Sequence, residues 1–318
     1  MHGGDLGSNL RTRIQPEILV RHPDILGESP AYDASNQRLV WADMFGNLVH
    51  ELIWTGGSTW QPGRTWNVGR PAAAVLPRAI GGLLVVSRTD VVALADNGET
   101  KVFASLSNEP RNGIRFNEAK CDHQGRLVAG WMAEDLSHSG AVVRVDLDGS
   151  VETILTDVGL ANGFDWSPDG TTFYFIDSMS LGVDAFDYSA TGTLGNRRTL
   201  VTIERGIGAP NGMTVDRKGG LWVVITYGGQ MRHYTARGEL VEIIELPTPV
   251  PTSCAFGGPD GDQLFITSKA SKTLASSLRE RLSITEDRIE AAERDEVGGA
   301  LFVCRPGVSG PAATSFAG

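Results

Sequence analysis

Residues 165–188, DWSPDGTTFYFIDSMSLGVDAFDY, decide the fold because a single pattern fills the whole stretch. An apolar residue leads into a polar turn with Asp and Gly, a β-rich run follows, and a second turn precedes another alternating run. Turn residues placed between runs of high strand propensity are typical of antiparallel strands joined by tight turns. The stretch therefore predicts consecutive antiparallel strands of one sheet.

The same pattern recurs along the chain. It begins again at AYDASNQRLVWADMFGNLVHEL (31–52), VLPRAIGGLLVVSRTDVVAL (75–94), KCDHQGRLVAGWM (120–132), TVDRKGGLWVVITYGGQMRHY (214–234) and AFGGPDGDQLFIT (255–267). Successive starts lie roughly 45 residues apart, which is the length of one four-stranded propeller blade. We therefore expect an all-β fold, a six-bladed β-propeller. A two-sheet sandwich is the alternative, but it has no reason to keep this period.

The pattern sets the expected domain organisation. Residues 17–318 are expected to form one propeller domain, and residues 1–16, which have no apolar core and are not a signal peptide, are expected to be disordered or left from cloning. The charged stretch 271–296 is rich in helix formers, which predicts a short helical excursion in the last blade with a solvated face. Residues 59–69, TWQPGRTWNVG, are predicted to form a loop over the channel mouth, lined by Trp60 or Trp66.

Composition narrows the class of partner. The net charge is −10 and no Lys/Arg block is present, so a nucleic-acid partner is not expected. No apolar run approaches the roughly 20 residues that cross a bilayer. The six histidines show no ligand spacing. The three cysteines, Cys121, Cys254 and Cys304, are far apart in the sequence and are expected to be small core residues, and this cysteine usage favours the cytoplasm. We expect a small-molecule ligand and a monomer or homodimer.

Polar residues recur just before the apolar strand of several repeats, at Glu28, Asn117, Asn162 and Asn211, which are two, one and one periods apart. In a propeller the innermost strands all start at one rim of the channel, so these side chains should converge. One carboxylate with amide oxygens suits a hard cation, calcium first and then magnesium, with manganese or zinc as further alternatives. The equivalent positions of the two remaining blades fall near 70–72 and 252–253.

Arg115 lies two residues before Asn117, so in a strand both side chains point to the same face. A guanidinium there can hold a carboxylate, phosphate or polyol oxygen of a substrate. The alternative is an arginine on the solvent surface.

The chain resembles the family of gluconolactonases, senescence marker protein (regucalcin) and luciferin-regenerating enzyme from about Glu17 to its end. The likeness depends on LGESPAYD (26–33), RFNEAKCDHQGRLVAGWMAED (115–135), residues 162–188 and PNGMTVDRKGGLWV (210–223). It implies a propeller with a divalent cation in its channel that hydrolyses sugar lactones.

The resemblance also implies roles for individual residues. Glu28, Asn162 and Asn211 match metal ligands, and Arg115 and Asn117 match residues that contact substrate, the asparagine also approaching the metal in some relatives. Asp135 takes the place of a substrate-binding glutamate. Trp131, where the family often has threonine, is expected to shape the pocket.

Asn211 departs from the family, which has an aspartate there that acts as metal ligand and proposed general base. Asparagine ligates through its carbonyl oxygen but accepts no proton at neutral pH, which leaves Glu28 as the catalytic carboxylate and the only formal anion of the four. Three explanations stay open: an introduced substitution, a natural enzyme with another base, or a repurposed binding pocket.

The sequence therefore predicts a metal-dependent hydrolase that opens a lactone or related cyclic ester, with Glu28 and Asn211 at the reaction centre. One alternative is a propeller enzyme of secondary metabolism that acts on a non-lactone substrate by cyclisation, lyase chemistry or ether hydrolysis. The other is a propeller that binds a metal or ligand without catalysis.

Overall fold

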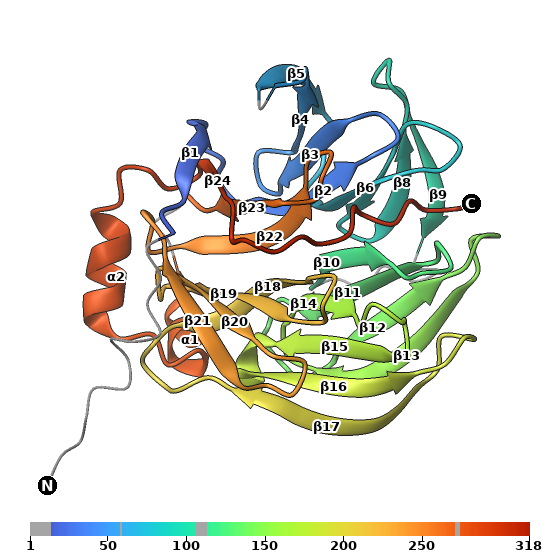
Figure 1. Cartoon of the computed structure of the whole chain (residues 1–318). Coiled ribbons are helices and arrows are strands. Elements are labelled where there is room, and N and C mark those ends of the chain that lie inside the picture. The colour runs from blue at the N-terminus through green and yellow to red at the C-terminus, as the bar shows by residue number, and fades with distance from the viewer. Residues whose placement is uncertain (1–13, 58, 106–112, 271–273) are drawn as a thin grey trace, which may run out of the picture.

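Each repeat of the sequence forms one four-stranded antiparallel sheet in the computed structural model, which describes residues 14–57, 59–105, 113–270 and 274–318. The first strands of neighbouring sheets contact one another in a closed ring. Figure 1 shows the sheets arranged around that ring like blades. The predicted six-bladed β-propeller is confirmed across the described chain.

The blades are numbered by the order of their first strands, and each sheet runs from that strand outward. Blade 1 consists of β2 (Gly27–Asp33), β3 (Arg38–Asp43), β4 (Leu48–Trp54) and β5 (Trp60–Asn67). Blade 2 consists of β6 (Ala72–Pro77), β7 (Leu83–Ser87), β8 (Asp90–Leu94) and β9 (Thr100–Ser105). Blade 3 consists of β10 (Ile114–Cys121), β11 (Leu127–Ala133), β12 (Gly140–Val145) and β13 (Val151–Val158). Blade 4 consists of β14 (Ala161–Trp166), β15 (Thr172–Asp177), β16 (Gly182–Tyr188) and β17 (Leu194–Thr202). Blade 5 consists of β18 (Ala209–Val215), β19 (Leu221–Thr226), β20 (Gln230–Tyr234) and β21 (Leu240–Glu245). Blade 6 consists of β22 (Pro251–Gly257), β23 (Gln263–Ser268), β24 (Leu301–Cys304) and β1 (Glu17–Val20).

Aspartate and glycine close the turns between first and second strands, as the repeat predicts. In blade 5, Asp216 accepts hydrogen bonds from the backbone N–H groups of Lys218 (2.8 Å) and Gly220 (2.9 Å). Gly219 lies between them with φ of +87°, a left-handed conformation that glycine adopts without steric penalty. Asp122 closes the equivalent turn of blade 3 in the same way. These turns bring each second strand back beside the first.

The core lies between the faces of adjacent blades. One apolar cluster joins blades 1 and 2 through Val40, Val49, Val75 and Val85, all of which are buried. Full burial of each such side chain contributes about 1.5–3 kcal/mol. The blades therefore hold one another mainly through aliphatic side chains, and the first strands, buried on both faces, are left to line the channel.

Blade 6 closes the ring with strands from both ends of the described chain. Its outermost strand is β1, where Ile18 pairs with Phe302 of β24. Of the segment 1–16, whose disorder the sequence predicts, residues 1–13 lie outside the described chain.

The predicted helical excursion is confirmed as two helices between β23 and β24, α1 (Ser276–Arg281) and α2 (Glu286–Glu293). Most charged side chains of the two helices are exposed, whereas several apolar residues beside them are not. Leu282, Ile284 and Ala292 are buried against Tyr227 and Val250, beside the starts of the first strands of blades 5 and 6. The excursion therefore covers part of one end of the propeller. Within the described residues, no helix has the length and apolar character needed to span a membrane.

The last residues of the chain, 309–318, form a strap across the opposite end of the propeller, which Figure 1 shows in red running toward the C-terminus. The strap is hydrogen-bonded in turn to blades 6, 1, 2 and 3, through Gly310 N to Gly261 O (3.0 Å), Ala313 N to Tyr32 O (3.1 Å), Phe316 N to Pro77 O (2.9 Å) and Ala317 N to Gly125 O (3.0 Å). Phe316 is completely buried in the core of blades 2 and 3.

The prediction of a loop over the channel at 59–69 is wrong. Residues 60–67 form β5, the outermost strand of blade 1 and the one farthest from the axis. Pro62 is tolerated there because an edge strand leaves part of its hydrogen-bonding capacity unused. Trp60 packs against Phe265 of β23 in blade 6, with ring centroids 5.3 Å apart.

Candidate functional site

The first strand of each blade is interrupted near its start, where the repeat places the polar residues. The pairing with the second strand shifts between Phe116 and Glu118, between Ala161 and Gly163, between Pro210 and Met213, and between Glu28 and Ala31. A bulge of this kind turns a side chain out of the regular ladder. The four residues at these bulges, here called the polar ring, are Glu28, Asn117, Asn162 and Asn211, each only 6–8% exposed. The remaining blades carry the same shift at Ala73 and at 252–253.

Hydrogen bonds link the polar ring through blades 3, 4 and 5. Arg115 Nη1 donates to Asn117 Oδ1 (2.6 Å), and Asn117 Nδ2 donates to Asn162 Oδ1 (2.9 Å). Asn162 Nδ2 donates to Ser178 Oγ (2.8 Å), which donates to the carbonyl oxygen of Pro210 (2.6 Å), the residue before the fourth ring position. This network holds both amides in one orientation.

Two members of the polar ring are less well satisfied. Asn211 Oδ1 is buried and has no hydrogen-bond partner among the described residues. Burial raises the pKa of Glu28 well above that of an ordinary carboxyl, with Glu118 raising it further and Arg115 and Lys269 opposing. Because an unpaired buried oxygen costs about 1–3 kcal/mol, Asn211 Oδ1 marks where the ring can accept a cation or a donor, and Glu28 is the acidic group of the same ring.

A second set of side chains lies at the same mouth, at the residue directly after the second strand of each blade. The second strand runs antiparallel to the first, so it ends at the rim where the first begins. These rim residues are Met44, Arg88, Glu134, Ser178, Tyr227 and Lys269. Sequence reasoning missed them, although their position one place beyond each second strand was readable from the repeat.

The rim residues bring charge to the mouth. Arg88 Nη2 lies 3.2 Å from Glu134 Oε1, and Lys269 Nζ lies 3.4 Å from the hydroxyl oxygen of Tyr227. Burial lowers the pKa of Lys269, an effect that the nearby Glu28 opposes. The mouth therefore combines cationic donors with the carboxylate of the polar ring.

Arg115 is directed into this mouth. Its guanidinium lies 5.9 Å from the ring centroid of Phe45, and Nη1 lies 3.6 Å from the sulfur of Met44. Burial lowers the pKa of Arg115, and Glu134 is the strongest opposing charge. Arg115 thus stays a cation with donors available to an anionic or hydroxylated ligand.

The structure places two other predicted substrate contacts away from the polar ring. Asp135 is exposed in the loop after β11, and its Oδ1 accepts a hydrogen bond from Ser137 N (2.9 Å). Hydrogen bonding by the Ser137 side chain, followed by this backbone bond, lowers the pKa of Asp135, as does Arg281 of α1 more weakly. Trp131 lies in β11 opposite Phe116, within the apolar cluster of blades 2 and 3. Glu134, the residue before Asp135, is therefore the acidic side chain with the strongest electrostatic effect on Arg115.

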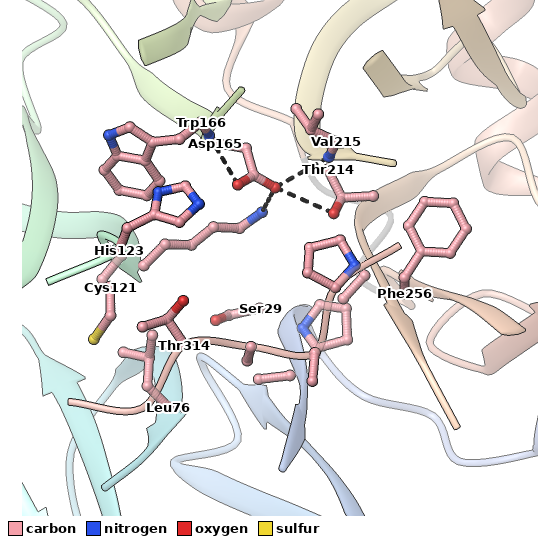
Figure 2. Close-up of a pocket in the computed structure, with 18 of the residues that line it drawn as sticks. Ser29, Leu76, Cys121, His123, Asp165, Trp166, Thr214, Val215, Phe256 and Thr314 are labelled. Carbon is pink, nitrogen blue, oxygen red and sulfur yellow. Dashed lines mark hydrogen bonds and ion pairs between the residues drawn. The ribbon is translucent and has the colours of Figure 1, made fainter. Parts of the chain in front are cut away.

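A cavity of about 310 Å³ lies at the other end of the channel, lined by the last residues of the first strands and by 311–314 of the strap. Figure 2 shows Asp165 in its wall, where its carboxylate accepts from Thr214 and from the backbone of Val215. Lys120 Nζ lies 3.1 Å from the same carboxylate and donates to the Met213 carbonyl oxygen (2.7 Å). These polar groups satisfy one another, whereas Nε1 of Trp166, another lining residue, has no hydrogen-bond partner among the described residues.

A group of potential nitrogen and oxygen ligands also forms outside the channel, at the junction of blades 6 and 1. His22, Asp24 and His50 each offer an atom within 4.8 Å of the other two. The sequence shows no ligand spacing for His22 and His50, because the segment before β2 meets β4 only in the folded blade 1.

Comparison with known proteins identifies the family of the chain. The model of the SMP-30/Gluconolactonase/LRE-like region matches residues 26–270. Regucalcin of Danio rerio is 34% identical over 260 residues, which cover 80% of this chain and 86% of that protein. Regucalcin of Homo sapiens is 32% identical over 301 residues, which cover 92% of this chain and 95% of that protein.

Solved structures show the same likeness. A luciferin-regenerating enzyme superposes with a TM-score of 0.82 at 26% identity, over 96% of this chain and 99% of that one. A calcium-binding protein, regucalcin from Agrobacterium tumefaciens, superposes with a TM-score of 0.81 at 22% identity, over 95% and 97% of the two chains, a likeness of fold alone. The chain is therefore a member of the SMP-30/gluconolactonase/luciferin-regenerating enzyme family, as its motifs predict.

Proposed function

We propose that this propeller is a metal-dependent hydrolase that opens a lactone or a related cyclic ester at the polar ring. The observation that carries the proposal is the pairing of an orphaned buried acceptor, Asn211 Oδ1, with a buried carboxyl at Glu28 in the same ring. Family membership supports the reaction class. A small-molecule substrate, no nucleic-acid or membrane partner, a monomer or homodimer, and a cytoplasmic location belong to the same proposal.

The donor set of the polar ring fits a divalent cation. Glu28, Asn162 and Asn211 would hold it, and all three offer oxygen, the ligand atom that calcium and magnesium prefer. Asn162 Oδ1 accepts one hydrogen bond and keeps a second lone pair. Asn117 Oδ1 is already engaged by Arg115, so Asn117 is expected to orient its neighbours and to ligate only secondarily. Calcium is the first candidate, and magnesium, manganese and zinc follow.

When bound, a divalent cation supplies Lewis-acid polarisation of the substrate carbonyl. The protein's own groups position the substrate: Arg115 donates to its oxygens, and Lys269 offers an ammonium to the alkoxide that leaves. Water attacks the carbonyl carbon, the acyl C–O bond breaks, and the product is an open hydroxy acid. Glu28 is the member of the polar ring able to accept the proton of that water, because asparagine cannot.

The proposal is tested with metal-stripped protein. Proton release is followed by pH-stat across a panel of sugar and aliphatic lactones, before and after calcium, magnesium, manganese or zinc is added. We expect turnover only with metal, and loss of both turnover and calorimetric metal binding in Glu28→Gln. Asp165→Asn, at the far end of the channel, is the matched control and should keep both. Lactone hydrolysis that needs neither metal nor Glu28, or none with any metal in the parent chain and in Asn211→Asp, would overturn the proposal.

A further inference from the structure

Three side chains meet where the closing strand of blade 6 passes into blade 1. His22 Nδ1 lies 2.6 Å from Asp24 Oδ1, and His50 Nε2 lies 3.2 Å from the same oxygen. His22 and Asp24 belong to the segment between β1 and β2, whereas His50 belongs to β4. Asp24 is 1% exposed and His50 4% exposed, while His22 reaches solvent.

Neighbouring groups orient these atoms. Trp41 Nε1 donates to Asp24 Oδ2 (2.8 Å), which leaves Oδ1 directed at the two imidazoles. His50 Nδ1 lies 3.2 Å from the hydroxyl of Thr65, and the His50 ring stacks on Trp41 with centroids 5.0 Å apart. Metal-binding histidines and carboxylates are typically fixed in this way through the atom that does not touch the metal.

His50 Nε2 is the second observation that points to a cation. It is buried and makes no hydrogen bond to any described residue, although Asp24 Oδ1 lies only 3.2 Å away. An imidazole nitrogen and a carboxylate oxygen at this separation, without hydrogen-bond geometry, present two lone pairs to one point. Asp24 Oδ1 already forms a hydrogen bond with His22 Nδ1 (2.6 Å), so a cation at that point would give His50 Nε2 the partner it lacks and would bring all three side chains to one ion.

Blade 5 contains a matched structure that lacks the third ligand. Trp222 Nε1 donates to Asp216 Oδ2 (3.0 Å), and His233 stacks on Trp222 with centroids 4.1 Å apart and has Nε2 3.4 Å from the same carboxylate. A Trp–Asp–His trio therefore serves structure by itself. His22 adds the third potential ligand to the trio of blade 1, and the described residues contain no second such group.

We propose that His22, Asp24 and His50 form a zinc site, separate from the polar ring, that fastens the ring closure of the propeller. Two imidazole nitrogens and one carboxylate oxygen suit zinc in a four-coordinate site, with water on the exposed His22 side as the fourth ligand. Because His22 and Asp24 precede blade 1 and His50 lies within it, the ion would tie the segment after β1 to β4. This site does not depend on the proposed hydrolase activity.

The test uses the whole chain, stripped of metal and titrated with zinc in calorimetry and with cobalt in absorption spectroscopy. The variants are His22→Gln, which removes an exposed ligand, and His138→Gln, an exposed histidine of another blade, as control. Loss of a metal-orienting partner costs about 10–100-fold in affinity, so loss of a ligand in His22→Gln should weaken zinc binding by at least about 100-fold. The tetrahedral cobalt spectrum should disappear in His22→Gln and persist in His138→Gln.

Thermal unfolding gives an independent readout. Zinc at about 100 times its Kd should raise the Tm of the parent chain and of His138→Gln by about 4 °C, and leave the Tm of His22→Gln unchanged. Measuring both effects in a Glu28→Gln background removes zinc bound at the polar ring. Equal zinc affinity of His22→Gln and the parent chain in that background, or an octahedral cobalt spectrum, would overturn the proposal.

Discussion

Replacement of Asn211 by aspartate is the sharpest test of the polar ring. The change keeps the shape of the side chain and converts an amide into a carboxylate. Asn211 Oδ1 has no hydrogen-bond partner among the described residues, so the new oxygen breaks no bond at that atom. The variant therefore isolates the effect of one negative charge and one proton acceptor.

The size of the effect follows from the position of that charge. Two unit charges 4 Å apart interact by about 4 kcal/mol at an effective dielectric constant near 20, and a divalent cation doubles this. Loss of hydration and repulsion by Glu28, whose pKa burial already raises, offset most of the gain. We expect about 10–100-fold tighter calcium binding, or about 1.4–2.7 kcal/mol. A positioned general base contributes about 10²–10⁴-fold, so kcat/KM for a lactone should rise by at least about 100-fold.

Calcium affinity is measured by calorimetry and lactone opening by pH-stat, with Asn162→Asp as the matched control. Asn162 Nδ2 donates to Ser178 Oγ (2.8 Å), and the Ser178 hydroxyl hydrogen is donated to the carbonyl oxygen of Pro210. An aspartate at 162 would therefore place a carboxylate oxygen against a lone pair of Ser178 Oγ. That variant should lose stability without gaining turnover. If Asn211→Asp binds calcium no better than the parent chain and opens lactones no faster, the polar ring is not a metal-dependent reaction centre.

Two further changes test the electrostatics of the channel and the packing of the strap. Burial raises the pKa of Glu118 from the usual 4.5 to about 7, so the folded chain holds a proton that the unfolded chain releases, and stability falls as pH rises through that window. Glu118→Gln removes this titration, so the free energy of unfolding of the variant minus that of the parent chain should be larger at pH 8 than at pH 4.5, by up to about 3 kcal/mol. Urea unfolding that gives the same difference between the two proteins at both pH values would contradict this prediction. Phe316→Ala should lower the free energy of unfolding by about 3–5 kcal/mol, because Phe316 is completely buried under the strap. Its neighbour Ile80, 72% exposed, should tolerate alanine within about 0.5 kcal/mol, and equal losses in both variants would show that the strap does not anchor the chain.

The sequence predicts the blades and the polar ring for one shared reason. Turn aspartates and glycines recur with a fixed period, and a closed ring of equal blades places residues of equal phase at one rim. Glu28, Asn117, Asn162 and Asn211 are in phase, and each lies at or directly beside a shift in the pairing of its first strand.

The sequence did not reveal the rim residues, because they occupy the same position in each repeat but differ in residue type. Arg88, Glu134 and Lys269 differ in charge, and only the antiparallel return of each second strand brings them to the mouth. The His22–His50 contact joins the segment before β2 to β4 across blade 1, which no local sequence pattern reports. The mistaken loop at 59–69 has a different cause: its aromatic residues and proline suggested a pocket, whereas an edge strand accommodates both.

The way blade 6 is assembled also determines when this protein can fold during synthesis. β1 is the first strand of the described chain to leave the ribosome, yet β24, with which it pairs, is the last. Until β24 emerges, β1 has no partner strand, and blade 1 lacks its neighbour across the closing seam. Completion of the ring therefore waits for the last strand of the described chain. During that interval the unpaired edges of β1 and β23 are open to other nascent chains, which makes slow translation and crowding a greater hazard for this fold than for one closed by neighbouring strands.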